Sequence, residues 1–239
     1  MATLRRHTRL ALLALLLLLL PAVSRAQDSI YYLPHLTYDV WYAQALHCPV
    51  AVQWNLTAAD LGSASTLPHR SFVADQNAPK PRVKSKHYTL SGYHRGHICP
   101  AADRGATYEG WADTFVMTNV APMVPQLNTG AWKCTEDECR EMVKTGCALT
   151  IFAAPLWLDT IMVSFSELSI VVPSHFVKRA TCSTHDGHTL RWCLSNQAVR
   201  QNIADCLISE DSMTTLILKS YDTWQRRSRC PEASATTTH

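Results

Sequence analysis

The stretch YHRGHICPAADR, residues 93–104, places two histidines and an arginine around a single glycine and continues into a cysteine and a proline. Gly92 and Gly96, set among β-forming residues, predict that residues 94–97 lie at a strand end or a turn. Such a cluster suits a zinc site, a buried structural turn, or a catalytic centre in which a histidine moves protons near neutral pH. The surrounding sequence has to decide among these three.

The N-terminal residues have the pattern of a secretory leader. Arg5, Arg6 and Arg9 form a positive segment, Leu10–Leu20 is an apolar run, and small residues precede Gln27. The alternative is an uncleaved membrane anchor, but a helical span needs about 20 apolar residues. We therefore expect a signal peptide over residues 1–26 and a secreted, extracellular protein with no membrane segment.

Removal of this leader changes the charge of the chain. The full sequence has 22 Lys and Arg against 19 Asp and Glu, and the leader holds four of the arginines and no acids. The mature chain is then formally −1, so a polyanionic partner has to be held by a local basic patch. Residues 27–230 suit one domain of ordinary size, and residues 231–239 read as a flexible tail.

Cysteine is frequent in the expected mature chain, which contains all nine of them. In an exported protein this indicates disulfide bonds, with at least one thiol left over. No CxxC pair supports a zinc site instead. The nine are Cys48, Cys99, Cys134, Cys139, Cys147, Cys182, Cys193, Cys206 and Cys230.

The secondary-structure signals favour an α+β fold with a largely antiparallel sheet, because many strand patterns surround few helices. The best helix pattern spans residues 129–146, where Ala131, Trp132, Cys139, Met142 and Val143 can share one side. A second helix is expected at residues 195–209. Strands are expected within residues 39–57, 115–117, 147–158 and 164–182, and a hairpin turn at 185–188 leads to a return strand at 190–194.

A second motif, TNVAPMVPQLNTGAWKCTE at residues 118–136, follows the histidine cluster. Together the two resemble the DNA/RNA non-specific endonucleases, whose signature is Asp-Arg-Gly-His-x-x-Pro, then Asn-x-x-Pro, then Asn-x-x-x-Trp at the start of a helix. The separations here are 31 residues from His97 to Asn128, 9 from Asn119 to Asn128, and 8 from Asn128 to Glu136, and all three fit that arrangement.

The resemblance implies a ββα-metal nuclease fold around one divalent cation, Mg²⁺ with Mn²⁺ as an alternative, and DNA and RNA as substrates. It makes His97 the general base for a water nucleophile. It makes Asn128 the metal ligand, with Glu136 holding metal-bound waters. A helix N-cap is the ordinary alternative for Asn128, and an exposed helix glutamate is the alternative for Glu136.

Further residues follow from the same resemblance. Arg95 presents a planar guanidinium suited to a phosphate, and Asn119 is placed to orient the phosphate or the metal's waters. Arg70, in the looser match HRSFVAD, is the expected phosphate-binding arginine upstream.

One residue departs from the signature, because His94 stands where the family usually has aspartate. A neutral imidazole accepts backbone hydrogen bonds less well than a carboxylate, so His94 keeps open a catalytically weakened module that binds nucleic acid or protein. It also keeps open a zinc site made by His94, His97 and Cys99. A phosphodiesterase acting on small nucleotides is a third alternative for the same site.

A basic run precedes the histidine cluster. In KPRVKSK, Lys80, Arg82, Lys84 and Lys86 occupy alternate positions, so in extended backbone they would form one positive stripe leading to His97. We expect Lys84 and Lys86 to contact the substrate's phosphates, and the alternative is a solvated edge strand. DNA versus RNA preference and oligomeric state stay open.

Overall fold

The computed structural model describes residues 29–62, 70–159, 163–184 and 187–229. The expected signal peptide and C-terminal tail, and Cys230, lie outside these residues. Within them, no helix has the length and apolar character needed to span a membrane.

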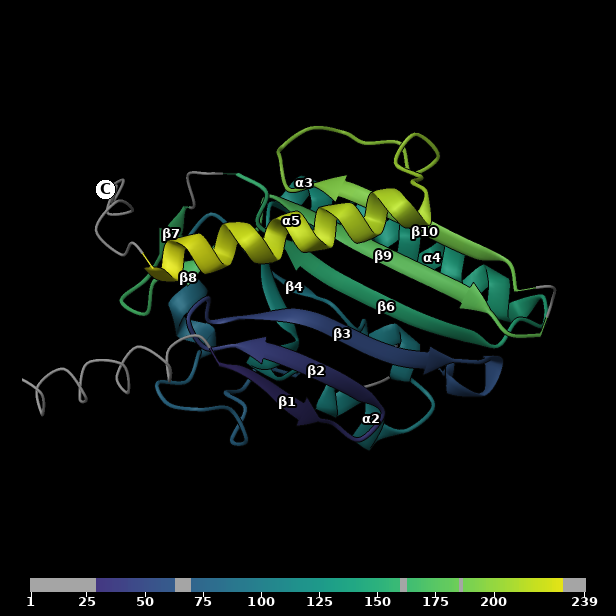
Figure 1. Cartoon of the computed structure of the whole chain (residues 1–239). Helices are drawn as coiled ribbons and strands as arrows, with labels where there is room; N and C mark the ends of the chain where they lie inside the picture. Colours follow the sequence, from purple (N-terminus) through teal and green to yellow (C-terminus); the bar gives the residue numbers. More distant parts are fainter. Residues whose placement is uncertain (1–28, 63–69, 160–162, 185–186, 230–239) are drawn as a thin grey trace, which may run out of the picture.

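The centre of the fold is a six-stranded sheet in the order β1-β2-β3-β6-β9-β10, in which every neighbouring pair is antiparallel (Figure 1). This confirms the α+β class and the antiparallel sheet. The strand patterns at residues 39–57, 147–158 and 190–194 are confirmed as strands, whereas β1 has no counterpart in the sequence prediction. The strands are β1 (Ile30–Pro34), β2 (Tyr38–Ala43), β3 (Cys48–Leu56), β6 (Leu149–Leu156), β9 (His175–Cys182) and β10 (Thr189–Ser195).

Two long helices lie on opposite faces of this sheet, α4 (Ala131–Lys144) behind it and α5 (Glu210–Arg229) in front, as Figure 1 shows. The predicted helix at 129–146 is confirmed as α4, which buries Ala131, Trp132, Cys139 and Val143. Strand β9 packs against both helices, because successive side chains of a strand point to opposite faces of the sheet. Phe176 accordingly packs against Trp132 of α4, with ring centroids 5.5 Å apart, while Val177 joins the cluster that contains Met213 of α5.

A two-stranded antiparallel pair, β4 (His94–His97) with β5 (Val120–Met123), precedes α3 (Pro125–Asn128) and α4. Residues 98–119 connect its strands, and we call the pair the β4–β5 hairpin. The predicted strand at 115–117 is wrong. Residues Met117–Asn119 form the 3₁₀ helix η5, and the strand begins at Val120. Pro122 is tolerated inside β5 because each strand of a two-stranded sheet has an unpaired edge, where the missing N–H costs no ladder bond.

The predicted helix at 195–209 is also wrong, because this segment is irregular and α5 begins only at Glu210. Its polar side chains bond other backbone groups, which competes with helix formation. Asn196 accepts a hydrogen bond from the backbone N–H of Val124, and Gln201 bonds both backbone groups of Ser195. Ser209 ends the loop by accepting the backbone N–H of Ser212 in the first turn of α5.

One disulfide is formed within the described residues, between Cys147 just before β6 and Cys182 at the end of β9. The bond joins β6 and β9 at the end of the sheet where the chain turns from β9 into β10. Part of the predicted turn at 185–188 lies outside the described residues, and Cys182 N–H donates to the carbonyl of His188 at 2.8 Å across it. The other described cysteines carry free thiols.

Candidate active site

The β4–β5 hairpin fixes the backbone of the histidine cluster. His94 pairs with Met123 and His97 with Val120, which leaves Gly96 opposite Ala121. A Cβ atom at Gly96 would lie 2.5 Å from the sulfur of Met123, which is fully buried. The hairpin therefore needs glycine at this position for close packing rather than for an unusual backbone angle.

His97 lies between two aromatic rings. Its ring centroid is 4.8 Å from that of Phe72 and 4.9 Å from that of Phe115. Its carbonyl accepts the indole N–H of Trp132 at 3.0 Å, which ties the hairpin to α4. Burial lowers the pKa of His97 to about 4, so the ring is neutral at physiological pH. Its Nε2 atom is covered and has no hydrogen-bond partner among the described residues. This nitrogen can accept a proton in the tautomer that carries its hydrogen on Nδ1.

Asn128 ends α3 and lies next to His94, with its Nδ2 3.2 Å from the Nδ1 of His94. The residue that departs from the signature therefore contacts the expected metal ligand directly. Asn128 is not a helix N-cap, because the N-cap of α4 is Gly130. In the orientation present here, the amide nitrogen faces the imidazole.

Glu136 belongs to a cluster of charged groups on the sheet side of α4. Its side chain is only 14% exposed, and burial raises its pKa to about 7. Arg140, one turn further, lies 3.9 Å from Glu136 and bonds Asp103 at 2.9 Å. Lys178 of β9, which is 1% exposed, places its Nζ 3.9 Å from the centre of the Trp132 ring. No expectation from the sequence covered three of these residues, Asp103, Arg140 and Lys178. The i, i+4 spacing of Glu136 and Arg140 could have indicated Arg140 as a partner of Glu136.

Asn119 is fully buried and does not face the surface. Its amide oxygen accepts the backbone N–H of Cys99 at 2.9 Å, and its amide nitrogen donates to the carbonyls of Cys99 and Thr114. The side chain holds the segment that follows the histidine cluster, so the expected contact with a phosphate or with metal-bound waters does not fit its position.

The two expected phosphate-binding arginines are both half-buried. Arg95 donates through Nε and Nη2 to the carbonyl of Ser85, at 3.2 and 2.6 Å, and lies 5.7 Å over the ring of Tyr88. Arg70 has its Nε covered and without a hydrogen-bond partner among the described residues.

The predicted stripe of Lys80, Arg82, Lys84 and Lys86 is wrong. The chain turns after Lys84 into the 3₁₀ helix η3 (Ser85–Tyr88), because Val83 and Tyr88 are buried in one apolar cluster. The Arg82 guanidinium is held by the backbone of Ala78 and Gln76, and Lys86 lies 3.8 Å from Glu167. Lys80, Lys84 and Lys86 instead border one hollow together with Glu167.

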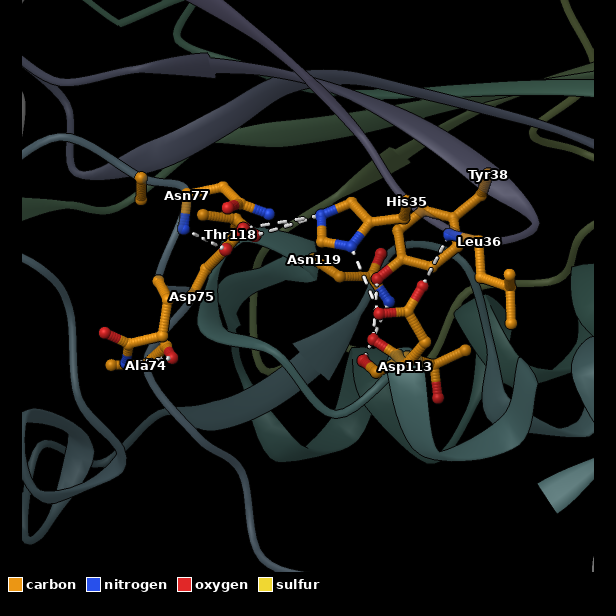
Figure 2. A network of polar contacts seen from close by, with 12 residues as sticks. His35, Leu36, Tyr38, Ala74, Asp75, Asn77, Asp113, Thr118 and Asn119 are labelled. Atoms are coloured by element: carbon orange, nitrogen blue, oxygen red, sulfur yellow. Dashed lines mark hydrogen bonds and ion pairs between the residues drawn. The ribbon is translucent and has the colours of Figure 1, made fainter. Parts of the chain in front are cut away.

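A charged network is centred on His35, and Figure 2 shows it at close range. The His35 ring lies between two carboxylates, 3.4 Å from Asp75 and 3.3 Å from Asp113. Burial alone would lower the pKa of His35, but the hydrogen bonds and charges of Asp113 and Asp75 outweigh it and raise the pKa to about 9. Thr118 donates to Asp75 at 2.6 Å, and the backbone N–H of Leu36 donates to Asp113 at 2.8 Å.

This network joins the two segments that supply the rings around His97. Asp75 follows Phe72 by three residues, and Asp113 precedes Phe115 by two. Val73 and Val116, each next in sequence to one of the two rings, form a parallel bridge, with Val73 N–H donating to the carbonyl of Phe115 at 2.9 Å. His35 therefore helps to position the aromatic pair, and no motif in the sequence signals this role.

The zinc alternative has no support in the part of the chain that the structure describes, where no three His, Cys, Asp or Glu side chains are grouped to hold a metal. Strand geometry explains this for the residues in question. His94 and His97 are three positions apart on β4 and point to opposite sides, and Cys99 is fully buried.

Comparison with known proteins places this geometry in a family. The family model described as DNA/RNA non-specific endonuclease matches residues 22–230. The chain belongs to that family. The resemblance deduced from the two sequence motifs is thereby confirmed.

Similar proteins include a nuclease of a Nostoc species, 43% identical over 106 residues, which are 44% of this chain and 38% of that protein. Nuclease C1 of Cunninghamella echinulata is 32% identical, with 52% of this chain and 54% of the relative covered. The human mitochondrial nuclease EXOG is 27% identical, with 66% and 47% covered. The chain thus spans about half or less of the length of these relatives.

A solved structure with the same fold comes from a crystal structure of an EndoG/EndoGI complex. The TM-score is 0.72 at 23% sequence identity, and the match covers 80% of this chain and 85% of the solved one. At this identity the match shows the fold alone.

The His35 network makes stability depend on pH. The pKa of His35 is about 9 in the folded chain and near its ordinary 6.5 when unfolded, so its stabilisation is complete below 6.5 and is lost as pH rises through 9. This amounts to at most about 3 kcal/mol. The lowered pKa values of Asp75 and Asp113 have the opposite sign, so their stabilisation is lost only in acid.

We therefore expect His35→Gln to flatten the loss of unfolding free energy between pH 7 and pH 10, measured by denaturant titration. His188→Gln, at an exposed histidine, is the matched control and should follow the wild-type curve. Parallel alkaline slopes for the wild type and His35→Gln would show that the network is not charged.

Proposed function

We propose that this protein is a secreted, metal-dependent endonuclease that hydrolyses the phosphodiester bonds of DNA and RNA with little sequence preference. The observation that supports it most is the neutral His97, held between two aromatic rings with an unpaired Nε2, on a hairpin whose neighbouring helices carry Asn128 and Glu136. Secretion rests on the leader-like N-terminal sequence.

His97 is the proposed general base. Hydrolysis of a phosphodiester needs a water molecule in line with the leaving oxygen, and a neutral imidazole can take its proton. A ring with a pKa near 4 accepts a proton weakly in the resting protein. The negative phosphate of a bound substrate would stabilise the protonated ring and raise this pKa when the base is needed.

The residues present fit a hard divalent cation. Asn128 supplies a neutral amide oxygen and Glu136 a carboxyl group, and Mg²⁺ needs only one or two protein ligands because it keeps most of its waters. Mn²⁺ accepts the same donors. When bound, such an ion would stabilise negative charge on the phosphate and on the leaving oxygen.

The basic residues are assigned to the substrate. Arg95 keeps N–H groups that Ser85 does not use, and the Nε of Arg70 has no partner in the described part of the chain, so both guanidinium groups can donate to phosphate oxygens. Lys84 and Lys86 belong to the border of the basic hollow next to η3 and would hold the backbone of a longer substrate. Asn119 supports the site by fixing the Cys99 backbone.

The main alternative is a weakened module that binds nucleic acid without cutting it, because His94 replaces the usual aspartate. The contact between His94 and Asn128 favours activity instead. A neutral His94 ring that accepts the amide N–H of Asn128 would leave the amide oxygen of Asn128 free for a cation. The amide orientation is assigned from this hydrogen bond.

Digestion assays test the proposal directly. Plasmid DNA and total RNA should both be cut in the presence of Mg²⁺, and EDTA should stop the reaction. Binding without cleavage would support the weakened module. Cleavage of a small phosphodiester with intact plasmid would support a phosphodiesterase that acts on small nucleotides.

His97→Ala should reduce cleavage by about 10²–10⁴-fold, because a general base contributes that much. DNA affinity, measured by fluorescence anisotropy, should stay close to the wild-type value. His188→Ala is the control for loss of an exposed histidine. If His97→Ala keeps more than about a tenth of the activity, His97 is not the base.

Asn128→Ala should raise the Mg²⁺ concentration needed for half-maximal activity and weaken direct binding of Mn²⁺, measured by water-proton relaxation. The reason is that the proposed amide ligand is gone. Gln126→Ala, an exposed amide on the same short helix, should change neither quantity. Unchanged Mn²⁺ binding in Asn128→Ala would remove Asn128 from the metal site.

His94→Asp should keep or raise activity, because a carboxylate can also accept the Asn128 amide N–H. His94→Ala should lower activity and shift the Mg²⁺ requirement upward, since nothing then orients Asn128. Equal activity of His94→Ala and wild type would show that this contact does not matter.

A further inference from the structure

Two free cysteines face each other at the edge of the central sheet. Trp192 of β10 forms an isolated antiparallel bridge with Leu207, which belongs to no strand. Cys193 N–H donates to the carbonyl of Cys206 at 2.9 Å, and Ile208 N–H donates to the carbonyl of Arg191 at 2.9 Å. One step along this ladder, Cys193 and Cys206 are therefore directly opposite each other.

This register suits a disulfide bond. Cys193 and Cys206 make one of the two hydrogen bonds of an opposed antiparallel pair, because the Cys206 N–H donates instead to the carbonyl of Ile203 at 3.2 Å. In a complete pair of this kind the Cα atoms lie about 5.5 Å apart, in the middle of the range that a disulfide spans. Burial raises the pKa of Cys193 to about 11, and the nearby Cys206 thiol adds to this effect. Both side chains are partly buried, Cys193 against the cluster that contains Met213 and Cys206 against the main core.

The remaining described thiols are placed differently. Cys48, Cys99 and Cys139 are at most 1% exposed within the core, and Cys134 is exposed on α4. The other partner that deserves a direct test is Cys134, because it lines a hollow together with residues of the 196–206 loop.

The loop between Cys193 and Cys206, residues 194–205, supports the candidate active site. Asn196, three residues after Cys193, accepts the backbone N–H of Val124 at 2.9 Å and donates to the carbonyls of Pro122 and Pro173. Val124 connects β5 to α3, which ends at Asn128. A link that closes the loop would therefore restrict the backbone that holds the hairpin in place.

We propose that Cys193 and Cys206 form a second disulfide bond, which closes the 194–205 loop and braces the β5–α3 connection. The inference goes beyond the nuclease function and does not depend on it. A small-molecule disulfide is a sufficient oxidant, and oxidised glutathione is the probe.

The exchange is balanced in two steps. One cysteine thiolate attacks the glutathione disulfide, which forms a mixed disulfide and releases one glutathione thiolate. The second cysteine thiolate attacks the protein sulfur of that mixed disulfide and releases the second glutathione thiolate. The two electrons lost by the protein thiols reduce one glutathione disulfide, and the two protons end on the two glutathione thiols.

Peptide mapping of the full chain tests the pairing. The folded protein is incubated with oxidised glutathione, its free thiols are alkylated, and it is then denatured and digested with trypsin without reduction. Cleavage after Arg191, Arg200 and Lys219 puts the two cysteines on separate peptides, 192–200 and 201–219. We expect these peptides to be joined and to separate on reduction. Alkylated Cys193 and Cys206, or a link from 201–219 to the peptide 134–140, which holds Cys134 and Cys139, would overturn the proposal.

Variants then test the bracing. Cys193→Ser and Cys206→Ser should each leave the partner thiol open to alkylation, and Cys134→Ser is the matched control that keeps the link. In either loop variant, amide hydrogen exchange over residues 120–128 should be faster than in the oxidised wild type. Unchanged exchange in this segment would show that the link does not brace the hairpin. If a variant fails to fold, the wild-type peptide map still decides the pairing.

Discussion

The hydrogen bond from the Trp132 indole to the carbonyl of His97 is the contact on which the candidate site depends. Trp132 is 1% exposed and packs its ring against Phe176 of the central sheet. Through this one side chain, the sheet, helix α4 and the β4–β5 hairpin are fixed relative to each other. This hydrogen bond is also costly to leave unmade, because Trp132 is buried and an unpaired buried donor loses its solvation without compensation.

Buried charge is concentrated on two sides of this contact. On one side, His35 joins Asp75 and Asp113, which lie close in sequence to Phe72 and Phe115. On the other side, Asp103 accepts from Arg140 and from the indole of Trp54. Burial raises the pKa of Asp103, and Arg140 counteracts this effect. Buried ion pairs often add little net stability because of their desolvation, so we regard geometric precision around the site as their main contribution.

The sequence errors share one physical cause, which is that tertiary contacts override local signals. The 195–209 segment has helical composition, yet Asn196 and Gln201 bond backbone groups that a helix would not offer them. The basic run at 80–86 alternates as a strand would, yet burial of Val83 and Tyr88 turns the chain. In both segments, periodicity alone could not reveal the competing partner.

The sequence by itself determined the α+β class, helix α4 and the family. The reason is that local residue patterns and the spacing of short motifs can be read directly from the sequence. It also supplied the candidate site residues His97, Asn128 and Glu136, whose roles stay a proposal. Only the tertiary structure decided that Asn119 is committed to the backbone, that His94 contacts Asn128, and that His35 lies between Asp75 and Asp113. These roles depend on contacts between residues 20 to 83 positions apart in the chain, and no local pattern encodes which distant side chain will fill a given space.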